Sequence, residues 1–130
     1  MNASLASQLV LRWSFALLFA WFGMQQLLDP SAWVDVLPAF TGYFPIPGEM
    51  LVQLNGWMEV CLAILLAIGY QTRLIAAFLA LHLFGIAASI GGATGVRDAA
   101  LGSMGVALAL PPADAWTLDA YLKRSTTKRA

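Results

Sequence analysis

The segment from Glu49 to Tyr70, EMLVQLNGWMEVCLAILLAIGY, constrains the fold more than any other part of the sequence. It has the composition of one apolar helix, and about 20 residues at the helical rise cover the roughly 30 Å of a bilayer's hydrocarbon core. Glu59 lies near its middle. Because a charge at that depth costs about 2.5 kcal/mol or more, we expect the carboxylate to face other protein or a water-filled cavity.

The composition agrees with a membrane protein. Hydrophobic residues make up 60% of the chain and charged residues only 11%, whereas soluble proteins have about 25% charged residues. The 7 basic and 7 acidic residues cancel, which gives no reason to expect a nucleic-acid partner. The single cysteine, Cys61, leaves no pair for an internal disulfide or dithiol redox chemistry.

We predict an all-α membrane protein, a four-transmembrane-helix bundle formed by one domain over residues 1–122. The four helices are expected at about residues 7–28, 49–69, 73–90 and 96–112. The first apolar run continues from Leu9 to Leu28, which is too long for a signal-peptide core of about 7–15 residues, so we interpret it as a retained span.

A proline- and tryptophan-rich connection, residues 29–48, follows the first helix and is expected outside the cytoplasm. Asp29-Pro30 is a suitable N-cap and first-turn pair, which predicts a short interfacial helix ending at about Leu37. The rest, AFTGYFPIPG, has too many prolines for a regular element and is expected to pack over the mouth of the bundle.

The fourth helix is short for a span, because only about fourteen apolar residues precede Pro111-Pro112. Two explanations stay open. Either the prolines kink the helix, so that Trp116 and Tyr121 reach the far interface, or Arg97-Asp98 is drawn into the bundle. Gly102 and Gly105 give this helix a small-residue face for close packing. Residues 123–130 are expected to form a basic, mobile cytoplasmic tail.

The basic residues fall on one side of the four-helix arrangement, with one exception, Arg97 beside Asp98. By the positive-inside rule, the N and C termini are both expected in the cytoplasm. The residues on that side are Arg12, Arg73, Lys123, Arg124, Lys128 and Arg129.

Polar residues of the second and third helices predict a shared site. Asn55 and Glu59 are four residues apart and therefore lie on one face. The short turn at residues 69–73 predicts that the two helices pack as antiparallel neighbours. Counting from that turn puts Glu59 about 15 Å and His82 about 13 Å along their helices. We expect the two side chains to meet inside the bundle, with Arg97 approaching from the outer side.

One face of the first helix also carries polar residues. Its members recur at helical spacing and are Arg12, Ala16, Phe19, Gly23 and Gln26. We interpret Arg12 as a topology anchor whose side chain reaches the headgroups. Gln26 could hydrogen-bond at headgroup level or contribute to the site.

The candidate catalytic residues are Glu59, as proton carrier or ligand anchor, and His82, as proton acceptor. Asn55, Arg97, Asp98 and Gln26 are the candidate substrate-binding residues. For each the alternative is structural: a carboxylate holding the helices in register, a neutral imidazole bonded between helices, and an interfacial ion pair of Arg97 with Asp98. One histidine with one carboxylate gives too few ligands to predict a metal site.

Several short motifs, in this order, resemble the DoxX family of small four-helix bacterial membrane proteins, over roughly residues 10–112. They are Phe22-Gly23, the Pro/Trp connection, Gly56-x-x-Glu59, Gly69-x-x-Thr72-Arg73, and Arg97-Asp98 before Leu101-Gly102. The resemblance implies a multi-pass protein of the bacterial inner membrane with Glu59 as the matching glutamate. Some relatives form part of a thiosulfate:quinone oxidoreductase, and others are associated with membrane redox complexes.

Two functional hypotheses follow. In the first, the protein is a redox-associated subunit, as in a quinone-linked oxidoreductase, that binds quinone or a small anionic substrate in a polar pocket. Because the sequence has no flavin, haem or iron–sulfur motif, electron transfer would need a redox partner protein. In the second, the protein is a non-enzymatic assembly or interaction protein. Its buried polar cluster then only fixes the packing of the helices, and the glycine face of the fourth helix docks a partner helix. Self-association into a homo-oligomer is compatible with either.

Overall fold

The computed structural model describes residues 3–127, and every regular element in that range is a helix. In chain order they are α1 (Ala3–Leu28), the 3-10 helices η1 (Pro30–Val36) and η2 (Ala39–Tyr43), α2 (Gly48–Ile68), α3 (Thr72–Ile90), α4 (Gly92–Ala109) and α5 (Leu118–Thr127). Within that range, three helices are long and apolar enough to cross a membrane, namely α1, α2 and α3. The all-helical prediction is confirmed.

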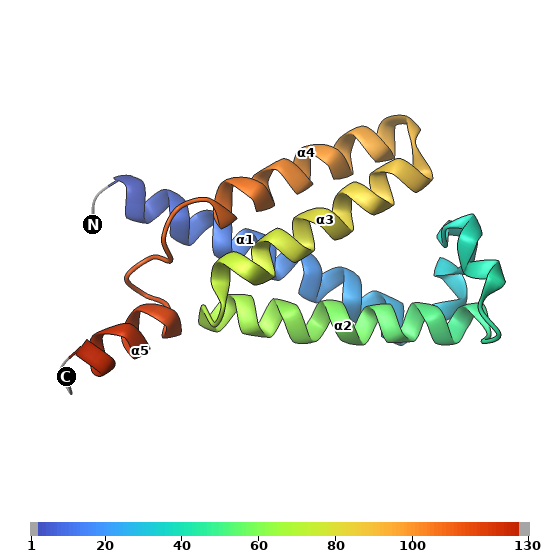
Figure 1. Cartoon of the computed structure of the whole chain (residues 1–130). Helices are drawn as coiled ribbons and strands as arrows, with labels where there is room; N and C mark the ends of the chain where they lie inside the picture. Colours follow the sequence, from blue (N-terminus) through green and yellow to red (C-terminus); the bar gives the residue numbers. More distant parts are fainter. Residues whose placement is uncertain (1–2, 128–130) are drawn as a thin grey trace.

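The helices α1 to α4 run back and forth in two hairpins (Figure 1). The most extensive contacts join α1 to α2 and α3 to α4, whereas α2 and α3 contact each other little. Figure 1 shows the α3–α4 hairpin diverging from α2, starting at the turn between α2 and α3. Our expectation that α2 and α3 pack as neighbours along their length is therefore wrong.

Glycines determine this pairing, because they let backbones approach where a side chain would hold them apart. Gly23 of α1 faces Gly56 of α2 so closely that a Cβ on Gly23 would lie 2.7 Å from the Gly56 carbonyl oxygen. In the other hairpin, a Cβ on Gly95 would lie 2.7 Å from the Ala87 carbonyl oxygen. A short turn connects α2 to α3, but close backbone contacts decide which helices pack together.

Replacing Gly23 with alanine is expected to lower the free energy of unfolding by about 1–3 kcal/mol, because the added methyl group forces two backbones apart. Gly85→Ala is the matched control, since a Cβ there would meet no atom within 4 Å and alanine favours the helix by about 1 kcal/mol. Denaturation of both variants in detergent tests this. Equal stability of Gly23→Ala and wild type would contradict the account of the hairpin.

Several element boundaries differ from the expected ones. Helix α4 begins at Gly92 rather than near residue 96, and it ends at Ala109, so Pro111-Pro112 terminate the helix rather than kink it. Of the two explanations for its short apolar part, the second holds for Asp98, which is buried, but not for Arg97, whose side chain is 57% exposed. The interfacial helix after Asp29 is of the 3-10 type, and the Asp29 side chain accepts from the Ala32 backbone N–H. Part of the proline-rich AFTGYFPIPG segment also forms a 3-10 helix.

The tail differs too, because residues 123–127 belong to helix α5. The remaining expected tail residues, 128–130, lie outside the described residues.

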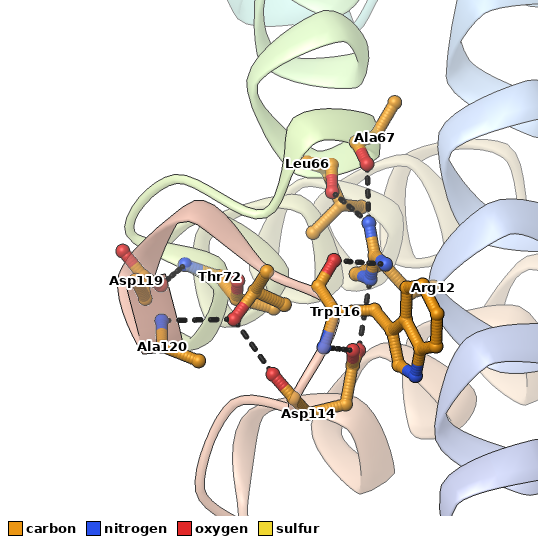
Figure 2. Close-up of polar contacts among 9 residues, drawn as sticks. Arg12, Leu66, Ala67, Thr72, Asp114, Trp116, Asp119 and Ala120 are labelled. Carbon is orange, nitrogen blue, oxygen red and sulfur yellow. Dashed lines mark hydrogen bonds and ion pairs between the residues drawn. The ribbon is translucent and has the colours of Figure 1, made fainter. Parts of the chain in front are cut away.

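Arg12 is not a headgroup anchor, because only 2% of it is exposed. Its Nε donates to Asp114 Oδ2 at 3.0 Å, and its terminal nitrogens donate to the carbonyl oxygens of Leu66, Ala67 and Trp116 (Figure 2). The segment after α4 folds back over the end of the bundle and supplies the carboxylate. A buried charge that finds an opposite charge and several acceptors has no need to reach the headgroups.

Candidate functional site

A cavity of about 490 Å³ lies between the two hairpins and beneath η1 and η2. It is lined by all six residues that the sequence predicted for a site, namely Gln26, Asn55, Glu59, His82, Arg97 and Asp98. These residues come from α1, α2, α3 and α4. The divergence of α3 from α2 opens the space, and the connection after α1 covers one side of it.

Glu59 is the centre of a hydrogen-bonded cluster inside the bundle, and only 2% of this residue is exposed. His82 Nε2 lies 2.9 Å from Glu59 Oε1, so the expected meeting of the two side chains is observed. Asn55 Nδ2 donates to the same carboxylate oxygen at 2.9 Å, and Gln26 Nε2 donates to Oε2 at 2.9 Å. The carboxylate therefore has a partner on each oxygen and is shielded from lipid.

The amide groups of the cluster are orientated by one another. Asn55 Nδ2 also donates to Gln26 Oε1 at 2.8 Å, so both of its N–H groups are used. Turning either amide over would place oxygen against oxygen or N–H against N–H. The donors of Asn55 and Gln26 thus converge on Glu59, which matches an acceptor-only carboxylate.

The close contact of α1 with α2 is what brings Gln26 within reach of Glu59. A Cβ on Gly56 would lie 2.8 Å from the Gly23 carbonyl oxygen and 3.1 Å from Gln26 Cβ. The predicted face of α1 is confirmed, since its members are the residues that the helix buries, together with Phe15. Gln26 is 6% exposed and hydrogen-bonds inside the bundle rather than at headgroup level.

His82 lies at the edge of the buried face of α3, and its side chain keeps 21% of its surface. Its Nε2 is taken by Glu59, whereas its Nδ1 makes no hydrogen bond within residues 3–127. Because His82 lines the cavity, this ring can hydrogen-bond a ligand there. The carboxylate behind it fixes the ring's position, an arrangement that supports proton exchange at the exposed nitrogen.

Arg97 lines the same cavity without joining the cluster. Its Nε donates to Asp98 Oδ1 at 2.8 Å, and its side chain is 57% exposed while that of Asp98 is 7% exposed. Within the described residues it has no hydrogen bond or ion pair to Glu59 or His82. The terminal nitrogens of its guanidinium make no hydrogen bond in that range either, so they are available to a ligand or to headgroups.

The rest of the cavity wall is mainly apolar, and sequence reasoning did not assign it to a site. Its aromatic members come from α1 and the connection, and they are Phe19, Phe22, Trp33 and Phe40. The ring centroids of Phe22 and Trp33 lie 5.8 Å apart in an edge-to-face arrangement. The available signal was the predicted interfacial helix, because such a helix has an apolar side and Trp33 lies within its range. As expected, the connection covers the mouth, and Pro38, Phe40 and Thr41 line the cavity.

Among the residues that the structure describes, no group of three or more His, Cys, Asp or Glu side chains could hold a metal ion.

Comparison with known proteins shows the family of this chain. The DoxX family model matches residues 7–92. The chain belongs to the DoxX family. In this DoxX protein the matched region contains Gln26, Asn55, Glu59 and His82, the whole hydrogen-bonded cluster, and stops before Arg97 and Asp98. With its apolar helices, it is a DoxX-family membrane protein. Searches of curated proteins and of solved structures found no match to it.

Proposed function

We propose that this DoxX protein binds a quinone-type molecule in the cavity and serves as the membrane subunit of a redox system. The observation that carries the proposal is one cavity with apolar walls and a polar cluster centred on Glu59 and His82. We place the protein in the bacterial inner membrane with both termini in the cytoplasm, as the distribution of basic residues predicts.

The cavity suits such a ligand in size and in chemistry. Pockets for small molecules have volumes of about 300–1,000 Å³, with apolar and aromatic walls and a few polar groups that fix the orientation. The volume of about 490 Å³ falls in this range. A quinone ring would lie against Phe19 and Phe22, with one ring oxygen at the His82 imidazole. The apolar tail of such a molecule favours entry from the bilayer.

The Glu59–His82 pair also suits the proton chemistry of quinones. Reduction of a quinone to a quinol takes up two electrons and two protons, and oxidation releases them. A carboxylate hydrogen-bonded to an imidazole can hold and pass a proton. Because the sequence has no motif for a redox cofactor, the electrons would come from or go to a partner protein. A small anionic substrate held by the terminal nitrogens of Arg97 is the alternative ligand.

An assembly role is the second candidate, since the cluster residues satisfy one another and could simply hold the helices together. The glycine face of α4, however, is already used. Gly102 packs on Phe84, and a Cβ on Gly105 would lie 2.6 Å from Phe15. Co-purification of a stoichiometric partner from native membranes, without small-molecule binding, would favour this role over ligand binding.

Titration of the purified protein with a short-tailed benzoquinone tests the proposal. We expect saturable binding, and we expect Gly85→Phe to weaken it at least about tenfold, because Gly85 lines the cavity and a large side chain there would fill it. Gly85→Ala is the control and should bind as wild type does. Absence of saturable binding in the wild type, or equal binding by the phenylalanine variant, would contradict the proposal.

A further inference from the structure

The opposite end of the molecule, away from the cavity mouth, is built by the chain's C-terminal segment. Figure 1 shows α5 at the same end of the bundle as the start of α1 and the α2–α3 turn. The segment is fixed there by the buried Arg12–Asp114 ion pair, in which the two side chains are 2% and 1% exposed. Asp114 Oδ1 in addition accepts from the Trp116 backbone N–H at 2.9 Å.

A second carboxylate fixes α5 to the start of α3. Asp119 accepts from the backbone N–H groups of Gln71 and Thr72, at 2.8 Å each. It thereby caps a helix N-terminus that the α2–α3 turn leaves without a side-chain cap of its own. Gly69, with a φ of 74°, lies directly against Thr117.

These contacts use the acidic residues of this end, whereas Arg73, Lys123 and Arg124 have no acidic partner among the described residues and Arg73 donates only to the Ala109 carbonyl oxygen. Asp114 is buried against Arg12, and Asp119 faces the backbone of α3. The exposed charged side chains of this end, within the described residues, are all basic, namely Arg73, Lys123 and Arg124. In the sequence Lys128 and Arg129 follow, outside the described residues. The other end is mainly acidic, with exposed Asp29, Asp35 and Glu49 beside one exposed basic residue, Arg97.

The same end also exposes large amphipathic and apolar side chains. Trp116 is 72% exposed and Tyr121 68% exposed, and Leu122 and Tyr70 are exposed as well. Because α1, α2 and α3 have the length to cross a membrane, this end of the bundle lies at one membrane surface. Aromatic side chains favour that depth, and basic side chains favour the phosphate groups there.

We propose that this end is a binding surface for the headgroups of anionic phospholipids, formed by Lys123 and Arg124 of α5 and Arg73 of α3, with Trp116 and Tyr121 inserted beside them. Asp114 is buried against Arg12 and Asp119 is half-buried against backbone N–H groups, so the exposed charges of this end are positive and complement lipid phosphates. The surface is distinct from the cavity and does not depend on its ligand.

Lipid titration of the full-length protein in neutral detergent tests this inference. The wild type is expected to retain dioleoyl phosphatidylglycerol over dioleoyl phosphatidylcholine, as measured by native mass spectrometry. Lys123→Gln with Arg124→Gln should weaken phosphatidylglycerol binding about 25-fold, at about fivefold for each charge removed. Asp35→Asn with Glu49→Gln removes two charges from the other end and should leave it unchanged.

A charge-retaining variant separates recognition from folding. Lys123→Arg with Arg124→Lys keeps both charges and should bind phosphatidylglycerol as the wild type does. Equal binding of the two lipids by the wild type, or undiminished binding by the glutamine variant, would overturn the proposal. Loss of binding in the charge-retaining variant would overturn it too, because charge would then not be what the lipid recognises.

Discussion

Asp114→Ala is expected to lower the free energy of unfolding by about 3–5 kcal/mol, because it leaves the buried Arg12 guanidinium without its counter-charge. The two side chains are among the least exposed in the described chain, and the ion pair spans the sequence from α1 to the segment after α4. Denaturant titration of the variant in detergent measures the loss. Asp35→Ala is the matched control at an exposed carboxylate and should change stability by less than about 0.5 kcal/mol.

A double replacement distinguishes loss of the pair from loss of packing. Arg12→Met with Asp114→Leu removes both charges and keeps much of the apolar volume, so it should recover most of the stability that Asp114→Ala loses. If the double variant is no more stable than the single one, the hydrogen bonds of Arg12 to the carbonyl oxygens of Leu66, Ala67 and Trp116 matter more than the charge pair.

Glu59→Gln is expected to weaken quinone binding at least about tenfold. Both carboxylate oxygens accept hydrogen bonds, so either orientation of a glutamine amide would place its NH2 group against a donor of Gln26, Asn55 or His82. The His82 ring would lose the acceptor that fixes it, and a hydrogen bond to a charged group is worth about 1.5–3 kcal/mol. His82→Ala should have a similar effect, because it removes the ring itself.

The control for this prediction is Glu49→Gln, the same chemical change at the exposed start of α2. It should bind quinone as the wild type does. Measuring unfolding alongside binding separates the two candidate functions. If Glu59→Gln lowers stability and leaves quinone affinity unchanged, the cluster has the structural role and the ligand-binding proposal fails.

Much of the cluster could be predicted from sequence, because it depends on the spacing of residues along a helix and on the free-energy cost of a charge in lipid. The spacing of Asn55 and Glu59 follows from helical periodicity, and the inward direction of Glu59 follows from the cost of a charge in lipid. The depth of His82 follows from counting residues on both sides of a short turn. These steps need only the helical spacing and the short turn, whereas the step from equal depth to contact assumed that α2 and α3 pack side by side. The two side chains meet although these helices contact each other little.

What could not be predicted depends on contacts between distant parts of the chain. The close contact of Gly23 with Gly56 pairs α1 with α2, and a glycine in a helix does not reveal which partner it will meet. Likewise, nothing in the sequence around Arg12 indicates that its carboxylate partner is Asp114. Asp114 is distant in sequence, and the segment that contains it folds back over the end of the bundle to reach Arg12. The two prolines before Asp114 were compatible with a kink or an end of the helix, and α4 ends at Ala109.

Photoaffinity labelling with an azido-quinone tests the central claim most directly, because it reports where the ligand lies as well as whether it binds. The purified wild-type protein would be illuminated with the probe and digested, and the modified peptides would be located by mass spectrometry. We predict adducts on cavity residues such as Phe22, Leu51 and Ile86, prevented by excess unlabelled quinone and lost in Gly85→Phe. Adducts confined to lipid-facing residues such as Leu17 or Trp57, or labelling that excess quinone does not prevent, would contradict the account.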